Sequence, residues 1–157
     1  MPAERPMRVV RHLGPGSWPE MRAAGSLTLA HADRHLRRKR LTTDAGPPVL
    51  IDLPAPVQLR DGDGLATEDG VWLVVRAAEE DLLEAAAADA AALARLAWHL
   101  GNRHTPAEIG PGRVRVAYDH VLEDMLRGLG TEPRRVRAAF EPEFGAYAAL
   151  HAHHERV

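Results

Sequence analysis

Histidine is the residue whose placement in this sequence points most directly to chemistry. Six of the nine histidines follow residue 98, and the chain contains no cysteine. Imidazole nitrogen suits nickel, copper and zinc alike, whereas thiolate metal sites and disulfides are excluded without cysteine. The late histidines therefore indicate a nitrogen-ligated metal site. Its candidate ligands are His104, His120, His151, His153 and His154.

The stretch 97–106, AWHLGNRHTP, places His99 and His104 on either side of a Gly-Asn pair. Their separation of five residues is not the i, i+4 spacing that lets one helix face hold a metal. Trp98 and His99 fall beside Leu100 at the end of a packing helix, which favours a structural role for His99. From its spacing alone, His104 fits a metal ligand and an uninvolved loop residue equally well.

His120 follows Asp119, a predicted N-cap. The positive end of the helix dipole disfavours a protonated imidazole there and favours the neutral form that binds metals. An uninvolved surface histidine in a first turn is the simpler alternative. The tract 151–154 can bind metal weakly and flexibly. Its interruption by Ala152 and the following "ERV" argue against an expression tag.

The elements that must position these histidines divide near residue 78. Earlier residues are broken by Gly and Pro into short Val- and Leu-rich segments, which predicts a small β-barrel or sandwich. Asp-Gly pairs at 61–62 and 63–64 indicate turns and not a calcium loop. The basic run 36–40 is typical of a solvated strand or loop. The expected strands are 7–13, 25–31, 48–53, 57–65 and 70–77.

Beyond residue 78 the chain is dominated by strong helix formers. Asp89 as N-cap and Gly101 as the stop predict a helix over 90–101 whose apolar face contains Leu96 and Leu100. The expected elements that follow are a strand at 112–118, a helix at 119–130 that ends at Gly128 or Gly130, and a strand at 134–140.

Composition excludes several classes of protein. The 157 residues are 45% apolar, enough for one domain or two small ones, and a formal charge of −2 provides no basic field for nucleic acid or membrane lipid. No apolar run approaches the roughly 20 residues that span a bilayer, and no secretion signal is apparent. We therefore expect a soluble cytoplasmic protein. Walker, nucleophile-elbow and dinucleotide-binding motifs are absent.

Three separated segments of the second half together resemble the urease accessory protein UreE family. They are HLGNRHTPAEI (99–109), YDHVLEDMLRGLG (118–130) and FEPEFGAYA (140–148), and RRKRLTTDAG, LIDLPAPVQLRDGDGL and VRAAEED precede them in family-like order. The resemblance implies an α+β protein with a strand near 81–86. Its implied parts are a small all-β, partner- or peptide-binding domain (1–77), a ferredoxin-like βαββαβ metal-binding and dimerisation domain (78–148), and a flexible tail (149–157).

The resemblance also implies a function. Members of the family are nickel metallochaperones, not enzymes, that supply nickel for assembly of the urease active site. His104 would be the central ligand, one copy from each subunit of a homodimer, with His120 peripheral and the tail histidines accessory. Zinc or copper could replace nickel. The implied partners are the urease apoprotein and urease accessory proteins, including the accessory GTPase.

The sequence departs from the family pattern at Tyr118, and two alternative functions stay open. Tyr118 stands where members often carry a histidine two positions before the one at His120, which lowers the expected number of bound ions. A metal-free interaction scaffold in urease maturation would need no ligands at all. A His-ligated metal-dependent hydrolase would need an open coordination position and a general base, and no H-E-x-x-H pairing is present.

Overall fold

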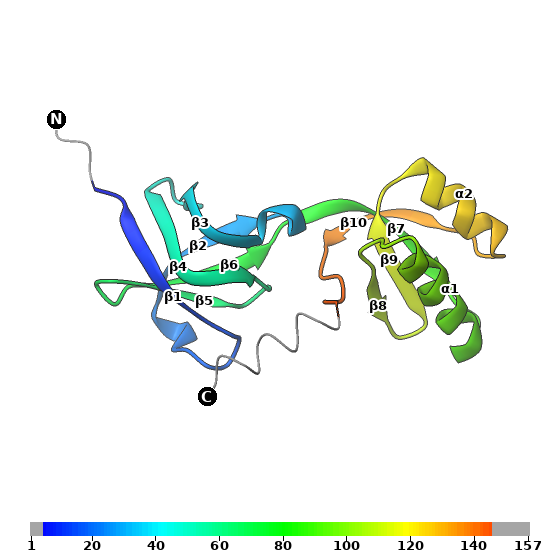
Figure 1. Ribbon diagram of the computed structural model, residues 1–157, viewed down its shortest axis with the longest axis horizontal. Coiled ribbons are helices and arrows are strands. Elements are labelled where there is room, and N and C mark those ends of the chain that lie inside the picture. Colours follow the sequence, from blue (N-terminus) through cyan, green and yellow to red (C-terminus); the bar gives the residue numbers. More distant parts are fainter. Residues whose placement is uncertain (1–4, 146–157) are drawn as a thin grey trace. The chain divides into compact units, whose positions relative to one another are not determined.

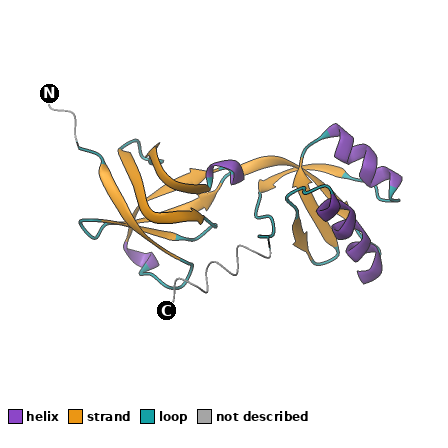
Figure 2. Cartoon of the chain, viewed as in Figure 1, coloured by secondary structure: helices purple, strands orange, loops and turns teal. Residues whose placement is uncertain are grey.

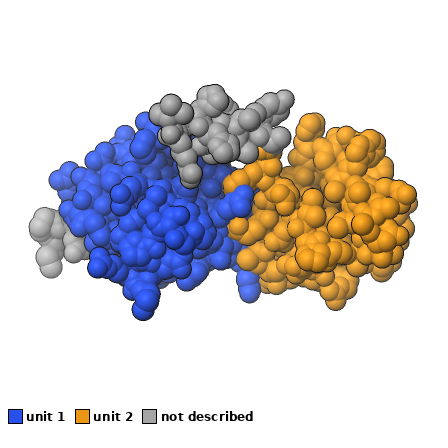
Figure 3. Space-filling view, turned by 90° about the horizontal axis from the view of Figure 1, so that it is seen from below, with its two compact units in different colours: residues 1–79 blue, residues 80–157 orange. Residues whose placement is uncertain are grey.

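The structure, a computed structural model, describes residues 5–145. The chain divides into two compact units, Met1–Glu79 and Glu80–Val157 (Figure 3). The first unit is built from strands and the second from strands and two helices, which confirms the predicted α+β class. In the described part of the chain, neither helix has the length and apolar character needed to cross a membrane.

Six strands of the first unit form one curled sheet in the order β2-β6-β5-β1-β4-β3 (Figure 1). The buried side chains of these strands form one apolar core, in which Val9, Leu27 and Ile51 are fully buried. Its elements are β1 (Met7–Leu13), η1 (Glu20–Arg22), β2 (Ala23–Leu29), η2 (His31–Asp33), β3 (His35–Thr42), β4 (Pro48–Gln58), β5 (Gly64–Thr67) and β6 (Trp72–Ala77).

One predicted strand of this unit, 57–65, is wrong. Residues 57 and 58 belong to β4, and a turn separates them from β5. Strand β4 continues past Pro54 and Pro56 because they lie between its two segments paired with β3, where the register shifts between Leu36 and Arg38. A proline in that unpaired stretch removes no ladder hydrogen bond. The basic run 36–40 lies on an exposed strand, one of the two predicted alternatives.

Gly64 illustrates how tightly this unit is packed. A Cβ at Gly64 would overlap the indole of Trp18. That indole stacks on Trp72 with ring centroids 5.4 Å apart, and its Nε1 donates to the carbonyl oxygen of Gly62 at 3.0 Å. The ring is therefore held on two sides and has little freedom to move away.

We expect Gly64→Ala to lower the free energy of unfolding by about 2 kcal/mol, because overpacking must displace the Trp18 ring. Gly101→Ala is the matched control, since a Cβ at that helical position meets no atom within 4 Å. It should stabilise the chain by about 0.5–1 kcal/mol. Urea denaturation measures both changes, and equal stabilities for Gly64→Ala and wild type would contradict the overlap.

The second unit has the element order βαββαβ and the sheet order β10-β7-β9-β8, with both helices on one face (Figure 2). This arrangement confirms the ferredoxin-like prediction. Leu96 and Leu100 of the first helix pack with Leu122 and Leu126 of the second against the sheet. The elements are β7 (Glu79–Ala86), α1 (Ala90–Asn102), β8 (Glu108–Gly110), β9 (Arg113–Ala117), α2 (His120–Gly128) and β10 (Arg134–Ala139).

Both predicted N-caps of this unit are confirmed. The side chain of Asp89 accepts a hydrogen bond from the backbone N–H of Ala92, at 2.8 Å, at the start of α1. Asp119 accepts from the N–H groups of Val121 and Leu122 at the start of α2. These bonds satisfy N–H groups that have no partner inside the helix, so they fix where each helix begins.

Three arginines converge on Glu84 of β7. Arg113 and Arg115 of β9 donate to its carboxylate at 2.7 Å each, and Arg134 of β10 donates at 2.8 Å. These bonds, that from Arg134 most of all, lower the pKa of Glu84 to about 2. One carboxylate therefore connects three of the four strands of this sheet.

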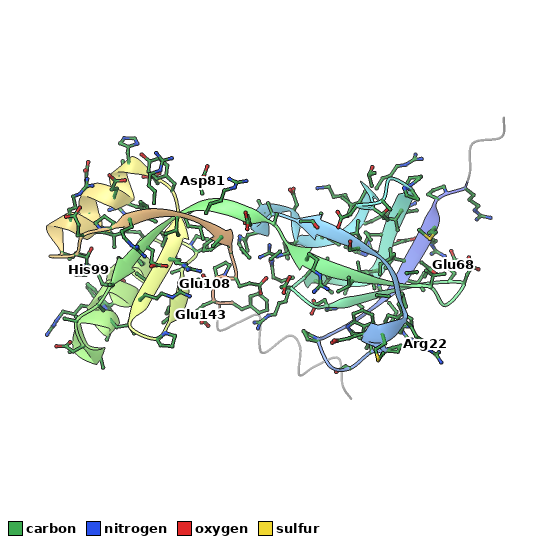
Figure 4. All side chains as sticks on the ribbon, turned by 180° about the vertical axis from the view of Figure 1, so that it is seen from behind. Arg22, Glu68, Asp81, His99, Glu108 and Glu143 are labelled. Carbon is green, nitrogen blue, oxygen red and sulfur yellow. The ribbon has the colours of Figure 1, made fainter. Side chains whose placement is uncertain are left out.

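We expect Glu84→Gln to lower the free energy of unfolding at pH 7 by roughly 2 kcal/mol. Because the folded pKa is depressed, the contribution of Glu84 is full above its ordinary value of 4.5 and is lost as the pH falls from there towards 2. The free energy of unfolding, measured by denaturation at pH 7 and at pH 3, should therefore change less between the two pH values in the variant than in wild type. Glu143→Gln is the control, because Glu143, labelled in Figure 4, is exposed. Equal losses of unfolding free energy in both variants would contradict the stabilising role of Glu84.

Candidate metal centre

His104 lies directly beyond the end of α1, in an unusual backbone conformation. Its φ angle is 55°, and it is the one non-glycine residue with a positive φ within residues 5–145. The N–H of His104 donates to the carbonyl oxygen of Gly101 at 3.0 Å, and the N–H of Thr105 donates to that of Leu100 at 3.1 Å. This pair of bonds is the left-handed cap that commonly closes helices.

The predicted stop at Gly101 is therefore wrong. Gly101 is the last but one residue of α1 and has no positive φ angle. The helix itself ends at Asn102, one residue beyond the predicted 90–101, but the left-handed cap position is three residues after Gly101 and is occupied by His104. An exposed glycine inside a helix is tolerated at a cost of about 1 kcal/mol.

The second helix closes with the same motif but uses the expected residue. Gly130 has a φ of 88°, its N–H donates to the carbonyl oxygen of Arg127, and the N–H of Thr131 donates to that of Leu126. Of the two predicted ends, Gly128 is the last residue of α2, and Gly130 supplies the left-handed cap beyond it. A side chain in this conformation costs roughly 1 kcal/mol relative to glycine. Backbone strain of this kind concentrates at functional sites, which makes the imidazole of His104 the candidate functional group at this cap.

His120 occupies the first position of α2, as predicted. The backbone N–H of Leu122 is the largest cause that holds the pKa of Asp119 below its ordinary value, and the charges of His120 and Arg103 act in the same direction. Arg103 is the C-cap of α1 and directly precedes His104. The end of α1 and the start of α2 thus lie near the same carboxylate, which brings His104 and His120 to one end of the helical layer.

Both histidines are exposed, and large apolar side chains are exposed in the same part of the chain. Trp98 is 65% exposed and Val121 47%. Trp98 and His99 do lie near the end of a packing helix, as expected, but α1 turns its Leu96 and Leu100 side to the core and leaves Trp98 exposed. Trp98 falls outside the apolar stripe of α1, which is consistent with its exposure.

His99, labelled in Figure 4, is half-buried on α1. It lines a cavity of about 280 Å³ together with Leu96 and Leu129. Its ring also meets that of Trp98 edge-on, with centroids 5.0 Å apart. These contacts agree with the structural role expected for His99.

Tyr118, which stands where the family resemblance implies a histidine, is contacted by an arginine. The guanidinium carbon of Arg135 lies 3.8 Å from the centroid of the Tyr118 ring. A cation held this close disfavours a second cation at the same place. Tyr118 and Arg135 together therefore make this position unsuited to a metal ion.

The predicted ligands are only partly brought together. Within residues 5–145, no three histidine, aspartate or glutamate side chains lie close enough to hold a metal ion. His104 and His120 share one end of the helical layer, and Asp119 beside them is used as an N-cap. His151, His153 and His154 lie outside the described residues. One copy of the described chain thus offers imidazole ligands but not a complete coordination shell.

Comparison with known proteins covers both units. Residues 7–78 match the family described as UreE urease accessory protein, N-terminal domain, and residues 80–157 match the corresponding C-terminal domain. The chain is 47% identical over 148 residues to the urease accessory protein UreE of Bradyrhizobium sp. (strain ORS 278), covering 94% of this chain and 70% of the relative. It is 43% identical over 144 residues to the urease accessory protein UreE of Mesorhizobium japonicum, covering 92% of this chain and 74% of the relative. It is 45% identical over 138 residues to that of Chelativorans sp. (strain BNC1), covering 85% of this chain and 87% of the relative.

Proposed function

Because the chain belongs to the urease accessory protein UreE family, we propose that it binds nickel and delivers the ion for assembly of the urease active site. In this role the chain is a carrier and not an enzyme, and nickel is its cargo. The observation that carries the proposal is the left-handed cap of α1, where an exposed imidazole replaces the favoured glycine. The proposed partners are the urease apoprotein and the urease accessory proteins, including the accessory GTPase.

We propose that the tight site is shared by two copies of the chain through their C-terminal domains. Two observations support this. The described residues of one copy do not provide three neighbouring ligands. The exposed apolar side chains Trp98 and Val121 belong to the same two helices whose adjoining ends carry His104 and His120. A two-fold interface would bury them and supply a second His104 without any further sequence requirement.

Such a site suits transport better than catalysis or permanent storage. A small number of exposed imidazole ligands can exchange the ion readily, and His120 with His151, His153 and His154 would provide peripheral ligands during loading or release. Nitrogen ligands bind copper more tightly than nickel, and zinc competes as well. Selection of nickel would then depend on partners and on which metal is available.

Activation of the urease apoprotein tests this function. The nickel-loaded chain is mixed with apoprotein and accessory proteins, in the presence of a chelator that removes free nickel. We expect urease activity to appear with the loaded chain and not with the same quantity of free nickel. The control is nickel-loaded His99→Ala, which removes a histidine of α1 that is not a proposed ligand. It should activate urease as well as the loaded wild type does.

Two results would replace the proposal. If the metal-free chain with separately added nickel activates urease as well as the loaded chain does, the protein is an interaction scaffold. If the loaded chain hydrolyses simple esters or amides and a chelator abolishes that activity, it is a metal-dependent hydrolase.

A further inference from the structure

Four consecutive cations lie on β3, at one end of the curled sheet: Arg37, Arg38, Lys39 and Arg40. All four are exposed. Strand β3 is the last strand in the sheet order and pairs with β4, so within the described residues no strand is paired with its other backbone edge. This basic edge of β3 has no part in the proposed nickel site, which lies in the other unit.

The charge of the basic edge is largely uncompensated. Arg38 lies opposite Asp52 in the ladder, but Arg8 of β1 already holds that carboxylate at 2.9 Å. Lys39 is 3.5 Å from Asp33. Among the described residues, Arg37, Arg38 and Arg40 have no ion-pair partner at all. Three guanidinium groups on one short strand therefore remain available to an external anion.

The basic edge is also held rigid at both ends. Before it, the buried Arg34 donates to the carbonyl oxygens of Leu29 and Leu59, at 2.9 and 3.2 Å. After it, the side chain of Asp44 accepts hydrogen bonds from the hydroxyls of Ser26 and Thr28 on the opposite edge strand, at 2.6 and 2.7 Å. A strand fixed in this way loses little conformational entropy when it binds a partner.

We propose that the basic edge of β3 binds an acidic, extended segment of a partner protein, which adds to the sheet as a further strand. Alternate residues of a strand share one face, so Arg38 and Arg40 stand about 7 Å apart on the same side. Acidic residues at every second position of an added strand have the same spacing. Backbone hydrogen bonds would supply affinity and the arginines would select acidic side chains.

The observations favour a protein segment over a nucleic acid. An open strand edge offers backbone N–H and C=O groups in a row, which match another strand and not a phosphate chain. The chain as a whole carries a formal charge of −2, which would repel the extended charge of a nucleic acid.

A binding experiment on the full chain tests this inference independently of nickel. The ligand is a fluorescently labelled peptide of about ten residues with glutamate at alternate positions; a lysine peptide and a single-stranded oligonucleotide of similar length are compared with it. The test variant is Arg38→Glu/Arg40→Glu. The control is Arg22→Glu/Arg95→Glu, which makes the same change in net charge at two exposed arginines elsewhere; Arg22 is labelled in Figure 4.

We expect the acidic peptide to bind wild type at low salt, with affinity at least about tenfold lower in the test variant and within about twofold in the control. Hydrogen exchange of β3 amides should slow on binding, which charge attraction alone would not cause. Arg38→Gln/Arg40→Gln repeats the test without charge reversal, in case the first variant folds poorly. The inference would be overturned if the acidic peptide did not bind, or if both double variants lost the same affinity for it. It would also be overturned if hydrogen exchange of the β3 amides did not change, or if the oligonucleotide bound more tightly than the peptide. Nickel binding should be unaffected in every variant.

Discussion

His104→Gly is expected to abolish tight nickel binding and at the same time make the chain more stable. Removal of the central imidazole should weaken nickel binding by at least about 100-fold. The free energy of unfolding should rise by about 1 kcal/mol, because glycine adopts the φ of 55° without the strain that a side chain experiences. Nickel titration and urea denaturation measure the two effects on the same sample.

The opposite signs of these effects make the prediction specific. A histidine that served only to end α1 would be replaced by glycine with a gain in stability and no change in metal binding. His104→Ala should lose nickel binding equally without the gain in stability, since alanine retains the strain. Full nickel affinity in His104→Gly would contradict the assignment of this residue as the central ligand.

Trp98→Glu is expected to dissociate the proposed dimer and to reduce tight nickel binding with it. A 65%-exposed tryptophan is the kind of side chain that contributes most to interfaces, and a buried unpaired carboxylate in its place is strongly unfavourable. We expect the dimer dissociation constant to rise by at least about 100-fold. Sedimentation equilibrium gives the association state, and nickel titration at the same concentrations gives the coupled loss.

Met21→Glu is the matched control, because Met21 is a fully exposed apolar side chain in the other unit. It should leave both the association state and nickel binding unchanged. A monomeric Trp98→Glu variant that keeps wild-type nickel affinity would show that one copy of the chain holds the ion alone. Dimers that persist in Trp98→Glu would place the interface elsewhere.

Periodicity and capping residues predicted the second unit well. Asp89 and Asp119 correctly predicted where the two helices begin, and the alternation of Arg and Val correctly predicted β9. These signals are local, because a cap or an apolar stripe depends on residues a few positions apart. Strands β7 and β8 were anticipated only through the family resemblance. The residues of β7 are mostly strong helix formers, and β8 has three residues, too few to carry a periodicity of its own.

The first unit was less predictable because its limits depend on partners distant in sequence. Strand β4 passes through Pro54 and Pro56 only because they lie in a bulge of β4 itself, where four of its residues face one residue of β3. The link between Asp44 and the strand that carries Ser26 and Thr28 likewise has no local signal. The site shows the same contrast. His104 could be selected from the sequence, but its left-handed conformation could not, because Gly101 is the residue that a capping rule selects.

The stoichiometry of the tightest nickel site shows whether two copies of His104 share one ion. Isothermal titration of nickel is carried out on the full chain and on a chain that ends at residue 149, which lacks the tail histidines. We expect one tightly bound nickel ion for every two chains in both proteins, because two copies of His104 would share the ion. One tight ion for each chain, or loss of the tight site when the tail is removed, would contradict this sharing.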